Sequence, residues 1–140
     1  MVIPKSYSRT LLRSSGAVLL GIVVGAALSL GTDQVLHVVK VYPPWGQPMY
    51  DPGLNLLALA YRIVFNIAGC YVIAWAAPYG PMGHALTGGL IGLVLSLAGG
   101  LAAMTADLGP LWYPVVLALT ALPCAWLGGV VYRRRHAPKA

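Results

Sequence analysis

Residues 57–77 read LALAYRIVFNIAGCYVIAWAA, and 19 of these 21 residues suit the interior of a lipid bilayer. A helix needs about 20 predominantly apolar residues to cross a membrane, so this stretch predicts a transmembrane helix. Two residues in its first half do not fit, because Arg62 carries a guanidinium and Asn66 carries an amide one helical turn later. The sequence therefore raises two questions: how many such helices there are, and why one of them contains a charge.

The composition indicates that most of the chain lies in a membrane. Of its 140 residues, 59% are hydrophobic and only 9% are charged, with a mean hydropathy of +0.77, whereas a soluble domain carries about 25% charged residues. Lipid offers the backbone no hydrogen-bond partners, so long apolar runs in it form helices. We predict an all-α, polytopic membrane protein with one domain over residues 1–140 and four transmembrane helices at about residues 14–36, 54–77, 84–104 and 111–132.

Basic residues gather at the two ends of the chain. Positively charged flanks remain on the cytoplasmic side of a membrane, so we expect both termini of this four-span chain in the cytoplasm and the protein in a bacterial inner (plasma) membrane. A nucleic-acid-binding domain spreads its basic residues over a folded surface, so we expect the lipid bilayer as partner and no nucleic acid. These basic residues are Lys5, Arg9 and Arg13 before the first run, and Arg133, Arg134, Arg135 and Lys139 after the last.

An alternative interpretation of residues 16–30 is that they form a signal peptide.

The four apolar runs resemble one another in pairs. A shift of 67 residues aligns the first run with the third, and a shift of 60 residues aligns the second run with the fourth. We interpret this pattern as two duplicated helical hairpins, related by a pseudo-twofold axis along the membrane normal. The alternative is a chance similarity between segments that are both rich in glycine and leucine.

Glycine motifs in the first and third runs predict close helix packing. Gly21 and Gly25 form one GxxxG motif, and Gly88 and Gly92 form another. Small residues at this spacing let two helix backbones approach each other in a membrane. We expect the motifs to pack the first helix against the third, and the alternative is that they form an oligomer face.

Prolines mark one helix start and one kink. Asp51 followed by Pro52 is typical of an N-cap and a first helical residue. Pro123 lies within the fourth run and cannot donate a hydrogen bond to the Leu119 carbonyl, so it is expected to kink the helix. The hydroxyl of Thr120 is close enough in sequence to compensate for that lost bond.

Aromatic residues flank the outer ends of the runs. Trp45 and Tyr50 lie in the proline-rich segment VYPPWGQPMYDPG, and Trp112 and Tyr113 lie in the second outer link. Tryptophan and tyrosine concentrate at membrane–water interfaces, so we expect Trp45 and Trp112, like the three C-terminal arginines, to act as interface anchors. The alternative for the proline-rich segment is a docking surface for another protein.

Four polar residues are candidates for a common cluster. Arg62 lies in the outer part of the second helix, and Asp33 with His37 shares one face of the first helix at a spacing of four residues. The proline-rich segment would then cover a meeting point of Asp33, His37 and Arg62, with Asn66 one turn deeper. Ionisable residues inside a membrane are functional candidates. The alternatives are a salt bridge that holds two helices together and a ligand, quinone or proton-handling site; two ligands are too few for a metal.

Catalytic motifs are absent from the sequence, which contains no HExxH, GxSxG or phosphate-binding loop. We therefore expect no catalytic residues, no cofactor and no enzymatic activity.

The chain contains the segments YPPWGQPM, ALAYR, APYGPMGHALTGGLIGLVLS and LGPLWYP. In these segments it resembles small four-span bacterial membrane proteins to which no activity is attached. We expect a non-enzymatic accessory or structural subunit that packs against itself or a larger membrane complex. The alternatives are an oligomeric transporter or channel for a small solute or ion, and a quinone- or lipid-binding protein.

Overall fold

The computed structural model describes residues 5–137, which form four α-helices and no strand. Each helix is long and apolar enough to cross a membrane, which confirms the predicted all-α, multi-pass membrane protein. The predicted bounds differ most at the first helix, which begins at Lys5 and not near residue 14. Residues 5–15 contain no glycine or proline to stop a helix. The helices are α1 (Lys5–Val38), α2 (Pro52–Ala76), α3 (Pro81–Thr105) and α4 (Trp112–Arg135).

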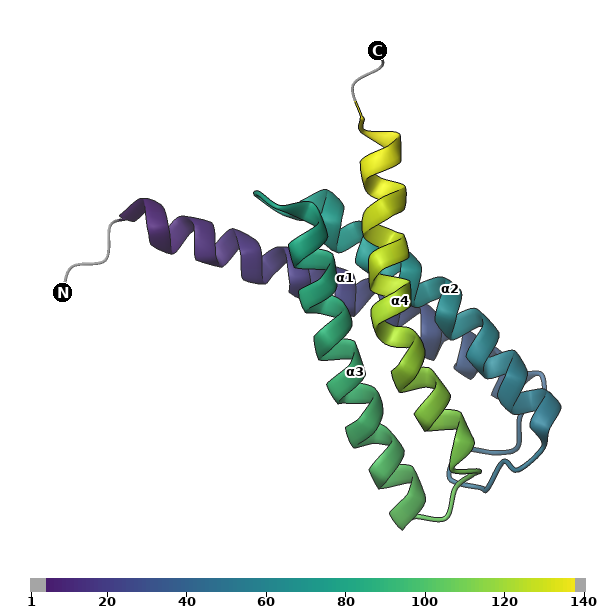
Figure 1. Cartoon of the computed structure of the whole chain (residues 1–140). Helices are drawn as coiled ribbons and strands as arrows, with labels where there is room; N and C mark the ends of the chain where they lie inside the picture. Colours follow the sequence, from purple (N-terminus) through teal and green to yellow (C-terminus); the bar gives the residue numbers. More distant parts are fainter. Residues whose placement is uncertain (1–4, 138–140) are drawn as a thin grey trace.

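The helices form two antiparallel hairpins, α1 with α2 and α3 with α4 (Figure 1). Helix α2 contacts α1, α3 and α4, and its contacts with α1 and α4 are much more extensive than the contact between α1 and α3. The α1–α2 and α3–α4 loops lie at the same end of the bundle, which is called the outer end below. These two outer loops meet, because the Met49 backbone N–H donates to the Leu108 carbonyl oxygen at 2.8 Å. The position of α2 explains why a polar residue on it can reach partners on several other elements.

Small residues let the helices approach one another closely. Buried core positions are mostly alanine, glycine and cysteine, and Ile73 of α2 is the largest side chain that is almost fully buried. The Ile73 side chain lies between Gly21 of α1 and Gly88 of α3, and a Cβ atom added at either glycine would collide with it. One isoleucine therefore joins three helices, and the two glycines provide its space.

The glycine motifs do not meet each other as expected from the sequence. Gly21 and Gly25 face α2, where their neighbours include the backbone of Gly69 and of Phe65. In α3, Gly88 also faces α2, and a Cβ atom at Gly92 would have no neighbour within 4 Å. The first motif thus packs α1 against its hairpin partner, because α2 presents a glycine backbone and one isoleucine at the matching height.

The outer ends of α1 and α3 finish in the same way. Lys40 and Asp107 both adopt a left-handed conformation, with φ of 61° and 52°, and the N–H of the following residue bonds to a carbonyl five residues earlier, as in a Schellman motif. These two residues are 67 positions apart, and the first residues of α2 and α4 are 60 positions apart. Both spacings equal the shifts found in the sequence, so the helix ends agree with the hypothesis of a duplicated hairpin.

Prolines lie at both helix positions that the sequence analysis named. The Asp51 carboxylate accepts a hydrogen bond from the Leu54 backbone N–H at 2.9 Å, and Pro52 is the first residue of α2, which confirms the predicted N-cap. Helix α4 continues through Pro123 and changes direction part-way along its length (Figure 1). Thr120 does not compensate at the Leu119 carbonyl as expected, because its hydroxyl donates to the Leu117 carbonyl at 2.9 Å.

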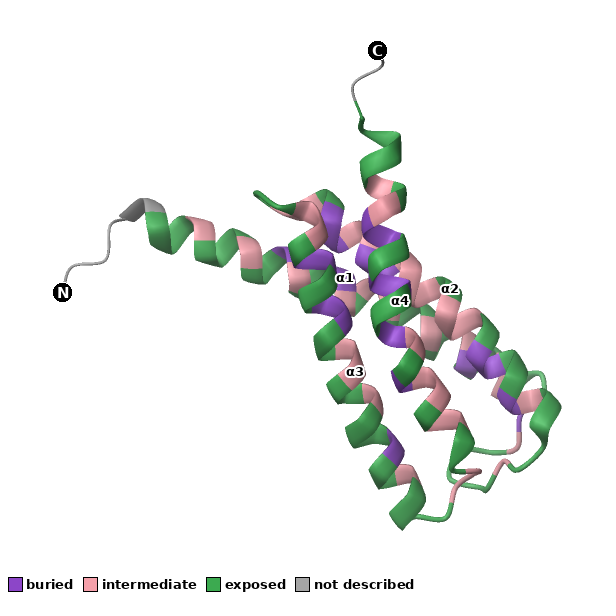
Figure 2. Ribbon diagram, in the orientation of Figure 1, coloured by how far each residue is buried: buried purple, intermediate pink, exposed green. Residues whose placement is uncertain are grey.

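The N-terminal part of α1 projects away from the other helices (Figures 1 and 2). Leu12 is 73% exposed, and a Cβ atom at Gly16 would have no neighbour within 4 Å. Ala17 is the first buried residue along the described part of α1. About 13 Å of helix, from residue 5 to residue 13 at 1.5 Å per residue, therefore extends beyond the bundle.

We predict that Gly21→Ala destabilises the protein by about 1–3 kcal/mol, the usual cost of overpacking a core. The added methyl group would collide with the Ile73 side chain and with the Gly69 carbonyl oxygen, which is backbone and cannot turn aside. Gly31→Ala on the same helix is the matched control, because a Cβ atom there has no neighbour within 4 Å. Thermal unfolding in detergent measures both, and equal stability of the two variants would contradict the packing described above.

Candidate functional site

An ion pair joins the first two helices inside the bundle. Arg62 lies about 15 Å along α2 from Pro52, at 1.5 Å per residue, and Asp33 lies in the outer part of α1. The Arg62 Nη2 and Asp33 Oδ2 atoms are 2.5 Å apart, and the Asp33 side chain is 6% exposed and that of Arg62 28%. Removing either partner would leave a charge in an environment that solvates it poorly.

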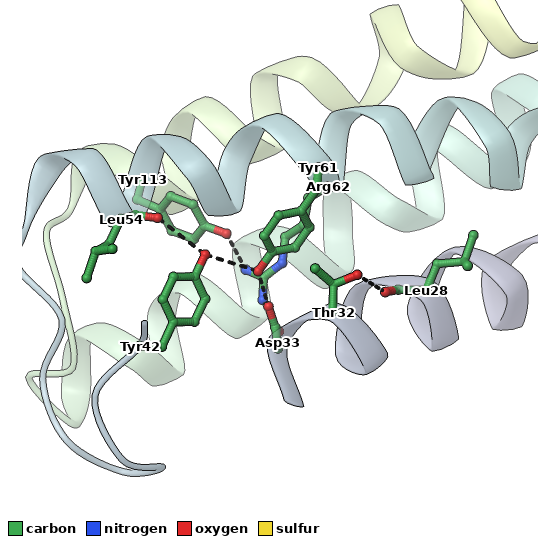
Figure 3. Close-up of polar contacts among 8 residues, drawn as sticks. All are labelled: Leu28, Thr32, Asp33, Tyr42, Leu54, Tyr61, Arg62 and Tyr113. Carbon is green, nitrogen blue, oxygen red and sulfur yellow. Dashed lines mark hydrogen bonds and ion pairs between the residues drawn. The ribbon is translucent and has the colours of Figure 1, made fainter. Parts of the chain in front are cut away.

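Two tyrosines complete the contacts of this ion pair (Figure 3). The Tyr61 hydroxyl donates to the second carboxylate oxygen of Asp33, and Nη1 of Arg62 donates to the Tyr113 hydroxyl oxygen. Tyr113 lies in the first turn of α4, so Arg62 connects α2 to both α1 and α4. The resulting cluster of Asp33, Tyr61, Arg62 and Tyr113 is referred to below as the outer polar cluster.

The loop between α1 and α2 covers this cluster through Tyr42. The Tyr42 hydroxyl lies 3.3 Å from the Tyr61 hydroxyl and 3.4 Å from the Leu54 carbonyl oxygen. Tyr42 is 5% exposed, and this burial raises the pKa of its hydroxyl above the ordinary value of 10.0. The hydroxyl therefore stays protonated at neutral pH and can donate to the cluster or to the helix backbone.

His37 contacts the loop above the ion pair. Its Nδ1 atom lies 2.5 Å from the Pro43 carbonyl oxygen, and its ring lies against Trp45 with centroids 4.0 Å apart. The Trp45 indole N–H donates to Gln34 at 3.1 Å. The structure thus brings Asp33 and Arg62 into direct contact, while His37 fixes the proline-rich loop above them.

Asn66 lies deeper, away from the ion pair. Its recorded contact is with the Cys70 thiol, whose sulfur is 3.9 Å from the amide oxygen. Cys70 and Cys124 are both buried and free. Asn66 therefore belongs to the lining of a cavity below the outer polar cluster and not to the cluster itself.

Three cavities meet at Arg62, which lines all of them. The outer cavity, about 180 Å³, lies beneath the proline-rich loop and includes Asp33 and His37. The central cavity, about 220 Å³, continues inward past Asn66. The lateral cavity, about 470 Å³, lies between the outer halves of α3 and α4. A guanidinium has five N–H groups, and the recorded hydrogen bonds engage only two nitrogens of Arg62.

The remaining carboxylates of the chain have structural partners. Asp51 caps α2, and Asp107 accepts a hydrogen bond from the Tyr50 hydroxyl across the two outer loops. That hydrogen bond raises the pKa of Tyr50 above its ordinary value of 10.0. Tyr50 and Tyr113, which the sequence suggested as interface residues, thus bind specific side chains. The chain contains three acidic residues, so neither of the other two is available to the cluster.

The predicted interface anchors lie at opposite ends of the bundle. Trp45 is 59% exposed and Trp112 is 37% exposed, both at the end that carries the outer loops. Arg133, Arg134 and Arg135 are exposed in the last turn of α4. Among the residues that the structure describes, no three metal-binding side chains come together.

We predict that the Asp33–Arg62 pair is energetically coupled. Arg62→Leu should cost about 3–5 kcal/mol of stability, because it leaves the buried Asp33 carboxylate without its partner. Asp33→Leu should cost less, because the Arg62 side chain that it leaves unpaired is 28% exposed. The double variant should cost clearly less than the sum of the two, since it leaves no charge behind. Unfolding in detergent of the four proteins measures the coupling, and strictly additive losses would show that the pair does not act as a unit.

Comparison of the chain with protein-family models, with curated proteins and with solved structures gives no match.

Proposed function

We propose that the protein is a non-enzymatic accessory subunit that packs against another membrane protein. The observation that carries this proposal is the projecting part of α1 together with a groove beside it. The groove, about 840 Å³, lies between α1 and the start of α3, and its lining includes Val18, Ile22 and Ile91. A projecting helix and an adjacent apolar groove are a geometry that a second set of membrane helices can fill.

The polar residues support the same proposal. Asp33, Arg62 and Tyr113 hold three helices together, Asp51 caps a helix, and Asp107 joins two loops. Acid–base catalysis needs a positioned group that is free to exchange a proton, and the three carboxylates of this chain are engaged in holding its elements. These contacts fit a subunit that supports an assembly.

Transport of an anion receives less support from this geometry. Arg62 is paired with Asp33 at 2.5 Å, so its charge is neutralised within the protein. Ile73 also fills the space between Gly21 and Gly88 at the inner end of the central cavity. A pathway through the bundle would require both the ion pair and this isoleucine to move.

We further propose that the protein lies in a bacterial inner membrane with both termini in the cytoplasm. Seven of the nine basic residues lie outside the helices' apolar runs, near the two termini, and cytoplasmic flanks carry an excess of lysine and arginine. A green fluorescent protein fused after Ala140 tests this orientation, because it fluoresces in the cytoplasm and not after export through the general secretion pathway.

The accessory role predicts a protein neighbour at the projecting part of α1. A photo-crosslinking amino acid at Leu12, which is 73% exposed, should give one crosslinked protein species of defined mass in the native membrane. Leu101 on α3, which is 63% exposed, is the control position and should give lipid adducts only. Mass spectrometry then identifies the partner as a second copy or another protein.

Two outcomes would contradict the accessory role. Position 12 could give lipid adducts only, or positions 12 and 101 could give the same mixture of random protein adducts. In either case no specific protein neighbour lies at the projecting part of α1, and the accessory role is wrong.

A further inference from the structure

The lateral cavity has the size and lining of a ligand site. Its volume of about 470 Å³ lies within the range of about 300–1,000 Å³ that small-molecule sites span. Most of its wall is apolar, and Leu95 and Met104, which line it, are about half exposed on the lipid-facing surface. A molecule dissolved in the bilayer could therefore enter between α3 and α4 without crossing water.

A side chain with unused hydrogen-bond donors lines this cavity. Arg62 lines it, and the hydrogen bonds recorded for its guanidinium use one N–H of Nη1 and one of Nη2. Asn55, which is 3% exposed, also lines it, but its Nδ2 donates to the Met49 and Asp51 carbonyl oxygens, so its donors are taken within the protein. Unused donors in an apolar surrounding cost free energy, so an occupant that offers a hydrogen-bond acceptor to Arg62 is favoured.

The charge of the site selects a neutral occupant. Asp33 already neutralises Arg62, and the structure places no other charged side chain in the lining of the lateral cavity. An anionic head group would bring a net negative charge into a medium that solvates charges poorly, whereas a carbonyl oxygen accepts the same hydrogen bonds without a net charge. The site thus fits an apolar molecule whose head carries neutral oxygen acceptors.

We propose that the lateral cavity binds a lipid-soluble quinone. One quinone carbonyl accepts hydrogen bonds from the free N–H groups of Arg62, and the ring lies near Tyr113. The apolar tail leaves between α3 and α4 past Leu95 and Met104 into the bilayer. This site is independent of the accessory role proposed above, because the groove beside α1 and the lateral cavity share no lining residue.

Glycine positions allow a test that leaves the outer polar cluster intact. Gly99 lines the lateral cavity and Gly92 lines the central cavity, and a Cβ atom at either meets no atom within 4 Å. Leucine at either position therefore fills one cavity without a backbone collision. Gly31→Leu adds the same side chain on α1, at a position that also has no neighbour within 4 Å and lines none of the cavities described.

The experiment photolabels the purified full chain with an azido-ubiquinone and maps the labelled peptides by mass spectrometry. We expect labelling within the outer halves of α3 and α4, competed by decylubiquinone. Gly99→Leu should reduce the labelling by about tenfold or more, because a leucyl side chain occupies the space of the ring. Gly92→Leu and Gly31→Leu should leave it unchanged.

Three results would overturn the proposal. Labelling could be spread over all lipid-facing helices and resist competition, or Gly99→Leu could label as well as the unchanged protein. The third is competition by oleate but not by decylubiquinone, which would show that the site takes an anion and that the charge argument is wrong. Circular dichroism of each variant confirms that it is folded, so loss of labelling reports on the cavity.

Discussion

A guanidinium about 15 Å along a membrane-spanning helix must be neutralised and hydrogen-bonded inside the protein, and this constraint organises the outer half of the bundle. Asp33 supplies the opposite charge from α1, and Tyr113 supplies an acceptor from α4. Tyr42 then closes the loop over the pair. The arginine in the middle of an apolar stretch is thus the point at which three helices and one loop are held together.

Sequence periodicity and composition were sufficient to predict the four helices, the N-cap at Asp51 and the proximity of Asp33 to Arg62. The tyrosines of the cluster were missed because a tyrosine near the end of an apolar run is equally typical of a membrane interface, and only the packing of α4 brings Tyr113 to Arg62. The partner of Gly21 was also missed. A GxxxG motif specifies close approach but does not name the opposing helix, and here α2 offers Gly69 and Ile73.

The two hairpins share their helix ends but not their chemistry. The sequence shifts of 67 and 60 residues match Asp33 with Gly100 and Arg62 with Leu122. Gly100 lies against Pro114, so the second hairpin closes by apolar contact at the height where the first uses an ion pair. On the hypothesis of duplication, the second hairpin has kept packing alone at this height, whereas the first hairpin carries the ion pair. The cavities converge on Arg62 of the first hairpin.

The most direct test of the central claim is a solid-state NMR distance in lipid bilayers between ¹⁵N-labelled arginine side chains and ¹³C-labelled aspartate carboxyl groups. The labelling is selective, because the other arginines lie near the termini and the other two aspartates lie at the outer loops. The account predicts one strong dipolar coupling, from Asp33 and Arg62 within about 4 Å of each other. Absence of that coupling in the folded protein would contradict it, since Arg62 would then face lipid or water without its partner.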